Sequence, residues 1–194
     1  NTGRCRELLV PGAKVYLEES GNPARKTQYD LIAVEKGTRL INMDAQAPNR
    51  VFEEWARGGG FLPELSLLRP ETTYRNSRFD FYVETKNQKI LVEVKGVTLE
   101  EDGVVRFPDA PSERAVKHVQ ELQKARKAGY EAYVLFVIQM KGVRYFTPNR
   151  QTHPEFAEAL QEAADAGVKI LARDCVVTTD SMTLADEVPV VLGQ

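Results

Sequence analysis

Two acidic residues and a lysine in neighbouring strand-like segments are the side chains of this sequence best suited to chemistry. Asp80 lies in the segment 77–83, and Glu93 and Lys95 lie in the segment 89–97, both rich in β-forming residues. Two carboxylates that face each other repel, and a cation between them removes that repulsion. Mg²⁺ prefers oxygen ligands, and a lysine beside it can stabilise charge on a phosphoryl group. The set predicts metal-dependent phosphoryl chemistry.

The expected turn of this hairpin determines which residues face each other. A polar stretch joins the two segments, and a two-residue turn at 86–87 places Asp80 directly opposite Glu93 in an antiparallel pair. Opposed residues have Cβ atoms about 4.5–5.5 Å apart. Because side chains alternate along a strand, Asp80 is expected on one face, and Phe79 and Phe81 together on the other. A slip of one residue would send the two carboxylates to opposite faces.

The same register brings two cations together. Arg78 is expected opposite Lys95, and Glu71 is the nearest spare acid. A glutamate and a lysine two positions apart are also common on solvent-exposed strand faces, where they have no catalytic role. Here they interrupt the apolar run 90–97, and charges inside such a run need partners or a metal. The residues alone leave both interpretations open.

The clearest helix of the sequence follows the hairpin. It is expected over 112–128, with serine as N-cap and glycine at its end. Arg114, His118 and Glu121 lie along the margin of its apolar side, and Lys117 lies just beyond. This row can reach across a sheet toward a phosphate, with arginine as a forked donor and lysine as a point charge. The alternative is a solvated basic face with His118 as a rim residue.

Charge is nearly balanced over the whole chain, with 26 Lys and Arg against 28 Asp and Glu. This balance excludes a global positive field, so a polyanion would have to bind local clusters. The expected helix that begins at 152–154 has an acidic outer side, which directs a nucleic acid to the 112–128 helix instead. The first segment is enriched in basic residues, namely Arg4, Arg6, Lys14, Arg25 and Lys26. Tyr16 and Tyr29 could stack on bases, although packing is the more common role of strand aromatics.

The order of expected elements indicates an α/β (α+β) architecture with a mixed sheet flanked by helices. Short strands over 1–45 resemble part of a larger β unit. A helix around Trp55, the hairpin and the 112–128 helix follow. The apolar run 130–138 is typical of a strand buried on both faces. A second helix and a strand at 168–172 come next.

Composition excludes several classes of protein. Of 194 residues, 42% are hydrophobic and 28% are charged, which is ordinary for a globular domain and excludes disorder and coiled coil. The longest apolar run, 132–140, is far shorter than the roughly 20 residues of a membrane span, so no membrane partner is expected. Cys5 and Cys175 form no metal-binding motif and indicate an intracellular, cytoplasmic protein. The first residue is not methionine, so the natural beginning is expected upstream.

Two resemblances connect these segments to known families. The residues at 78–80 followed by those at 92–95 resemble the active-site motif of the PD-(D/E)xK nuclease superfamily, with Phe79 at the position of the superfamily's proline. A wider ordered set resembles the bacterial and archaeal sugar fermentation stimulation protein A family over nearly the whole chain. The segments that carry this second resemblance are 1–3, 77–81, 92–99, 107–110 and 113–118.

The resemblance implies a fold and a site. The fold is a partial OB-like β-barrel over 1–45, its first portion missing, and a restriction-endonuclease-like domain over 46–194. The site has Asp80 and Glu93 as ligands of Mg²⁺ or Mn²⁺ and Lys95 as the catalytic lysine. The implied partner is DNA, bound without sequence specificity. Residues expected to contact its phosphates are Arg114, Lys117, Arg4 and Arg6, and accessory candidates at the site are Glu71, Arg78 and His118.

Two functions of different classes remain open. One is a Mg²⁺- or Mn²⁺-dependent nuclease, that is, a phosphodiesterase. The other is a non-catalytic DNA-binding regulator of sugar (maltose) metabolism genes that retains the nuclease scaffold. Intact Asp80, Glu93 and Lys95 favour the nuclease, because binding alone needs no facing acids. Sugar binding, which the family's name suggests, has little support from one tryptophan and no aromatic cluster. The sequence does not determine the oligomeric state.

Overall fold

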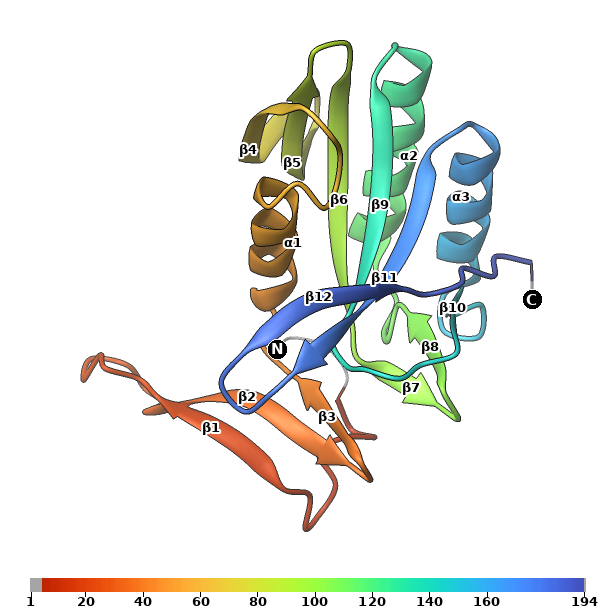
Figure 1. The fold of residues 1–194 in the computed structure, drawn as a ribbon. Helices are drawn as coiled ribbons and strands as arrows, with labels where there is room; N and C mark the ends of the chain where they lie inside the picture. The colour runs from red at the N-terminus through yellow and green to blue at the C-terminus, as the bar shows by residue number, and fades with distance from the viewer. Residues whose placement is uncertain (1–4, 194) are drawn as a thin grey trace.

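A central six-stranded sheet organises the molecule, whose computed structural model describes residues 5–193 (Figure 1). The strand order is β12-β11-β9-β6-β5-β4. β6, β9 and β11 are parallel, and β4, β5 and β12 are antiparallel to their neighbours, as the expected mixed direction requires. The bounds are β4 (Leu65–Tyr74), β5 (Ser77–Thr85), β6 (Lys89–Val97), β9 (Glu131–Ile138), β11 (Lys169–Val177) and β12 (Met182–Glu187).

Helices cover both faces of this sheet. α1 (Ala47–Arg57) packs on one face, and α2 (Glu113–Lys127) and α3 (Pro154–Asp165) pack on the other (Figure 1). Every residue of β9 after Glu131 is buried, which confirms the expectation of a strand covered on both sides. Burial of each large apolar side chain contributes about 1.5–3 kcal/mol, so β9 anchors both helical layers. Within residues 5–193 no helix is long and apolar enough to cross a membrane.

Two smaller sheets adjoin the lower end of the central sheet in Figure 1. The first is antiparallel, with β1 (Val15–Glu19), β2 (Tyr29–Lys36) and β3 (Arg39–Asn42) in that order. The second has the order β10-β8-β7, with β7 (Leu99–Glu101), β8 (Val104–Phe107) and β10 (Tyr145–Pro148).

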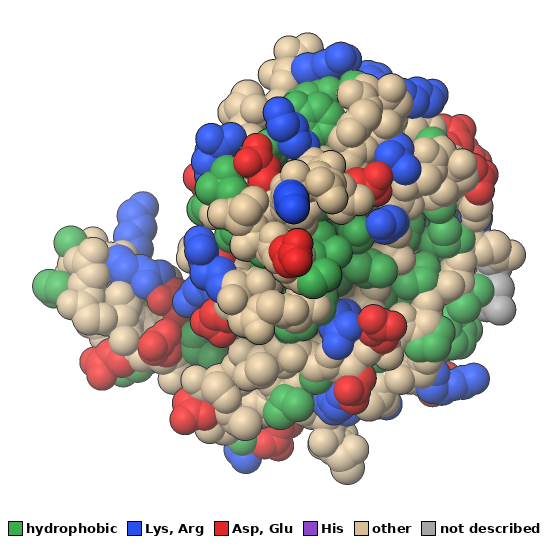
Figure 2. All heavy atoms as spheres, turned by 45° about the horizontal axis from the view of Figure 1, so that its top comes forward, with side chains coloured by type: hydrophobic (Ala, Val, Ile, Leu, Met, Phe, Trp, Pro, Cys, Tyr) green, Lys and Arg blue, Asp and Glu red, His purple; other side chains and the backbone are tan. Residues whose placement is uncertain are grey.

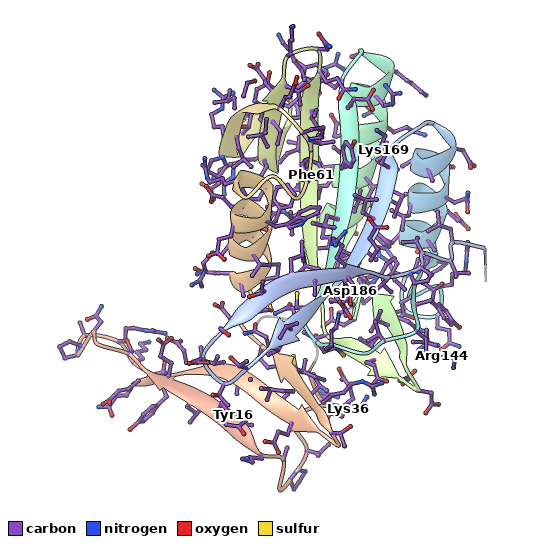
Figure 3. All side chains as sticks on the ribbon, viewed as in Figure 1. Tyr16, Lys36, Phe61, Arg144, Lys169 and Asp186 are labelled. Atoms are coloured by element: carbon purple, nitrogen blue, oxygen red, sulfur yellow. The ribbon has the colours of Figure 1, made fainter. Side chains whose placement is uncertain are left out.

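A buried carboxylate joins these two smaller sheets. Glu100 of β7 is 2% exposed and pairs with Lys36 of β2 at 2.8 Å and with Arg39 of β3 at 3.1 Å. Lys36 is labelled in Figure 3. Removing one partner of a buried ion pair leaves an uncompensated charge. The contact therefore holds the N-terminal sheet in one position against the rest of the chain.

The β5–β6 hairpin has the expected register. The amide of Thr85 donates to the carbonyl of Gln88 at 3.0 Å, which places the two-residue turn at 86–87. Pairing continues from there to Phe81 opposite Val92, and it ends one step before Asp80 and Glu93 would meet. The two strands separate at that point, so the expected opposition of Arg78 and Lys95 does not occur.

The expected alternation along β5 is wrong at one place. Phe79 packs in the core on the side of α2, whereas Phe81 packs on the side of α1. The neighbouring strand explains the change, because the pairing of β4 with β5 is interrupted at Glu71, which has a positive φ of 51°. With pairing lost on both of its edges, β5 turns about Asp80 and brings Phe79 to the opposite face.

A glycine at the end of β6 allows three elements to approach closely. A Cβ on Gly96 would lie 2.5 Å from Oε1 of Gln139, which follows β9, and 2.8 Å from Cγ of Pro48 in α1. The amide of Gln139 also donates to the carbonyl and side-chain oxygens of Asn42 and to the carbonyl of Asp44. This contact fixes the start of α1 against β6.

Gly96→Ala should therefore destabilise the fold. We expect a loss of about 1–3 kcal/mol, because the added methyl must displace packed neighbours, and a lower urea midpoint with an unchanged slope would show it. Gly21→Ala is the matched control, since nothing lies within 4 Å of its added Cβ. Equal midpoints for the two variants would contradict the close packing at Gly96.

Candidate functional site

Glu93 is the most enclosed charged group at the site. It is 2% exposed, and its Oε1 accepts hydrogen bonds from Nζ of Lys95 at 2.5 Å and from Nδ1 of His118 at 2.6 Å. Its other oxygen, Oε2, is buried and has no hydrogen-bond partner among residues 5–193. A buried carboxylate oxygen without a partner carries a desolvation penalty, so Oε2 is the atom at which a ligand would gain most.

Asp80 lies where β5 leaves β6 and is half-buried. Its Oδ2 accepts from the amide of Val94 at 2.8 Å, and its Oδ1 accepts from the side-chain amide of Asn49 at 3.0 Å. The carboxylate of Asp80 thus takes the place of a strand hydrogen bond to β6. This contact places Asp80 beside the backbone that carries Glu93.

The environment shifts the pKa values of the two carboxyls in opposite directions. Burial raises the pKa of Asp80, and the charge of Glu93 raises it further, against the hydrogen bonds from Val94 and Asn49 and the charge of Lys95. Burial also disfavours charge on Glu93, but His118 and Lys95 together outweigh it and hold the pKa of Glu93 below its usual range. Two negative charges on this pair are therefore unfavourable, and a cation near Asp80 would reduce the repulsion between them.

His118 reaches Glu93 from the second turn of α2. The side chain of Ser112 accepts a hydrogen bond from the amide of Ala115 and caps the helix, as expected. The ring of His118 packs edge-on against Phe79 with centroids 5.9 Å apart. His118 is 5% exposed, so it is a buried partner of Glu93 and not the rim residue of the alternative interpretation.

The contact between Asn49 and Asp80 could not be predicted from the sequence. Asn49 stands in the first turn of α1, three residues after Gln46 at the N-cap position, which is where asparagine is usually favoured. The contact joins residues 31 positions apart through the packing of α1 beside β5. No local pattern contains that information.

Glu71 and Arg78 lie outside this group. They form an ion pair with each other at 3.6 Å, and their side chains are 69% and 60% exposed. Among residues 5–193 neither forms a hydrogen bond or ion pair with Asp80 or Glu93. Glu71 thus compensates Arg78, as the nearest spare acid was expected to do.

The two basic candidates of α2 are exposed. Arg114 and Lys117 lie in its first half, on the N-terminal side of His118. Nζ of Lys117 donates to the carbonyl of Asn76 in the β4–β5 turn at 3.1 Å, which ties α2 to that turn. Glu121 is buried and pairs with Lys124 at 2.7 Å, so it is not a free group at the helix margin.

Acidic neighbours compensate much of the positive charge in the N-terminal segment. Lys14 pairs with Glu35 at 2.8 Å, and Arg25 pairs with Asp30 at 2.5 Å. The hydroxyl of Tyr16 donates to Glu35, whereas Tyr29 is 53% exposed. The expected positive surface is therefore reduced.

Basic and acidic side chains also lie close together around Arg6 and on the face drawn in Figure 2. Arg6 is exposed and lines a cavity of about 370 Å³ together with Glu7, Glu101 and Asp109. Arg4 lies outside the described residues. On the face in Figure 2, Lys and Arg side chains alternate with Asp and Glu, so no field of one sign covers it.

The described residues contain no group of three or more His, Cys, Asp and Glu side chains arranged to hold a metal. The site thus offers at most two carboxylates, Asp80 and Glu93. A hard divalent cation held by one or two carboxylates keeps several positions for water and phosphate oxygens. The donor set fits such an ion, and the unpartnered Oε2 of Glu93 supports the fit.

Asp80→Asn should stabilise the ligand-free protein at neutral pH. Because the folded-state pKa of Asp80 is raised, the charged form destabilises the fold above that pKa and the protonated form does not below it. The gain should therefore be present at pH 7 and should disappear as the pH falls through the folded-state pKa. Each kcal/mol gained raises the Tm by about 2–4 °C for a chain of this size.

Thermal unfolding in EDTA at a series of pH values measures this effect. Asp102→Asn, at an exposed aspartate, is the control and should change stability by less than about 0.5 kcal/mol. A lower Tm for Asp80→Asn at pH 7 would contradict the electrostatic account of the site.

Comparison with known proteins places this geometry in a family. The model described as "Sugar fermentation stimulation protein RE domain" matches residues 46–181, and the model described as "SfsA N-terminal OB domain" matches residues 1–43. A sugar fermentation stimulation protein homolog of Desulfitobacterium hafniense is 61% identical over 99% of this chain and 84% of its own length. A homolog of Clostridium beijerinckii is 56% identical over 99% of this chain and 85% of its own length.

A solved structure extends the similarity to the fold. The structure of Pyrococcus furiosus SfsA in complex with Ca²⁺ superposes with a TM-score of 0.90 at 29% sequence identity. It covers 98% of this chain, and the alignment spans 83% of that protein. The expected fold class, an N-terminal OB-like unit and a restriction-endonuclease-like mixed sheet flanked by helices, is confirmed. The chain therefore belongs to the sugar fermentation stimulation protein (SfsA) family.

Proposed function

We propose that this protein binds DNA without sequence specificity and cleaves phosphodiester bonds with a divalent cation held by Asp80 and Glu93. The single observation that carries the proposal is the buried, unpartnered Oε2 of Glu93 beside a second carboxylate whose pKa is raised. A protein that only bound DNA would gain nothing from two crowded acids. The Ca²⁺ in the complex of the Pyrococcus relative is a hard, oxygen-seeking ion of the same class.

Asp80, Glu93 and Lys95 have distinct roles in this proposal. When bound, Mg²⁺ or Mn²⁺ supplies a Lewis acid that polarises a phosphoryl oxygen and lowers the pKa of a water ligand. Asp80 and Glu93 supply the anionic oxygens that hold the ion. The side chain of Lys95 is 16% exposed, and its Nζ donates to Glu93. Lys95 would thus place a cationic group at the site where phosphoryl charge develops.

DNA should approach from the α2 side. Arg114 and Lys117 are exposed there, within four positions of His118, so they would contact backbone phosphates on one side of the metal site. Arg6, with Arg4, would extend these contacts at the N-terminal end. Contacts to phosphates fix position and carry no sequence information, in agreement with non-specific binding. The proposed domains are a DNA-contacting OB-like unit, 1–45, and the nuclease-like unit, 46–194.

A cleavage assay tests the proposed activity. The chain is incubated with plasmid and with short single- and double-stranded DNA in Mg²⁺, Mn²⁺ or EDTA. Cleavage should need the metal and should fall by about 10²–10³-fold in Lys95→Ala, as expected for loss of a charge-stabilising group. Arg57→Ala, on the opposite face of the sheet, is the control and should cleave normally.

The same assay addresses the alternative function. Equal DNA binding by the wild type and Lys95→Ala, with no cleavage under any condition, would contradict the nuclease and favour the non-catalytic regulator. Cleavage that persists in EDTA would contradict the metal site.

Arg114→Ala and Lys117→Ala should each weaken DNA binding. Each lost phosphate contact reduces the slope of log Kd against log salt by about 1. Fluorescence anisotropy with a labelled duplex between 50 and 200 mM salt, a range in which such contacts are strongly screened, measures the slope. Unchanged slopes in both variants would show that DNA binds elsewhere on the molecule.

A further inference from the structure

The two helices on opposite faces of the central sheet each send one side chain to a different carboxylate of the site. Asn49 comes from α1 and donates to Asp80, and His118 comes from α2 and donates to Glu93. We propose that Asn49 and His118 are the positioning residues of the metal site, which determine the carboxylate oxygens that remain free for a cation. This inference rests on the proposed function.

His118 and Lys95 together saturate one oxygen of Glu93. The Nδ1 of His118 and the Nζ of Lys95 both donate to Oε1, at 2.6 and 2.5 Å. His118 and Glu93 are each more than nine-tenths buried, and Phe79 supports the ring of His118. Glu93 cannot rotate its carboxylate without losing two hydrogen bonds in an apolar environment. The oxygen that faces away from both donors, Oε2 in this structure, is therefore held in one position.

Asn49 fixes the second carboxylate in the same way. Its amide and the backbone amide of Val94 donate to different oxygens of Asp80, at 3.0 and 2.8 Å. A carboxylate oxygen has two lone pairs, so each oxygen of Asp80 keeps one direction free. The position of Asn49 is itself fixed, because neighbouring Pro48 packs where Gly96 has no side chain.

The consequence is a preorganised site. A cation that enters finds both carboxylates already oriented by groups that do not contact it. Side chains that orient metal ligands in this way usually contribute about 10–100-fold to metal affinity. A merely structural role for Asn49 and His118 would instead lower the stability of the fold and leave the metal affinity of the folded protein unchanged.

Isothermal titration of the chain with Mn²⁺, and separately with Ca²⁺, distinguishes these roles. His118→Phe keeps a ring against Phe79 and removes the donor. His118→Asn keeps an N–H donor near the position of Nδ1. Asn49→Leu removes the other donor with little change in shape. Gln120→Ala, on the exposed face of α2, is the control.

We expect His118→Phe and Asn49→Leu to bind Mn²⁺ about 10–100-fold more weakly than the wild type. His118→Asn should recover most of the loss, and Gln120→Ala should bind normally. Circular dichroism and thermal unfolding of each variant confirm that the titrated protein is folded. If His118→Phe does not fold, the comparison of His118→Asn and Asn49→Leu with the wild type carries the test.

Each result has a separate meaning. Wild-type affinity in His118→Phe and Asn49→Leu would overturn this inference and leave the metal site intact. Equal loss in His118→Phe and His118→Asn would overturn the role of the Nδ1 hydrogen bond. A wild-type chain that binds neither Mn²⁺ nor Ca²⁺ would overturn the proposed function itself, and this inference with it.

Discussion

The arrangement of the site depends on one buried carboxylate whose two oxygens differ. Oε1 of Glu93 receives both the ammonium of Lys95 and the ring of His118, whereas Oε2 receives nothing from residues 5–193. An ionised carboxylate is stable at 2% exposure only when donors compensate it. The donors here come from β6 and α2, so the charge on Glu93 and the packing of α2 on the sheet depend on each other.

The rest of the fold positions the second carboxylate, Asp80, from the other face of the sheet. β5 leaves β6 just where Asp80 can accept the amide of Val94, and α1 delivers Asn49 to the same carboxylate. The approach of α1 requires Gly96 and the contacts of Gln139, which also hold the end of β3. The N-terminal sheet is thus linked to the position of Asp80 through Gln139 and α1.

Much of this site follows from sequence patterns, because the patterns involved are local. The two-residue turn at 86–87 sets the register of the hairpin, and the capping serine sets the phase of α2. Strand alternation is wrong at Phe79, because it assumes continuous pairing. Pairing with β6 ends at Phe81, and pairing with β4 is interrupted at Asp80 before it resumes at Phe79.

Contacts between elements that are distant in the sequence cannot be predicted from these local patterns. Asn49 meets Asp80 only after α1 has docked, and Glu35 compensates Lys14 only after β1 and β2 have paired. Charge counts along the sequence overestimate the positive surface of the N-terminal segment for this reason.

The proposed metal site can be tested most directly with a crystal structure of the protein grown with Mn²⁺, in which an anomalous difference map locates the ion. We expect one peak within coordinating distance of Asp80 and of Oε2 of Glu93. A peak elsewhere, or none at saturating Mn²⁺, would contradict the proposed metal site.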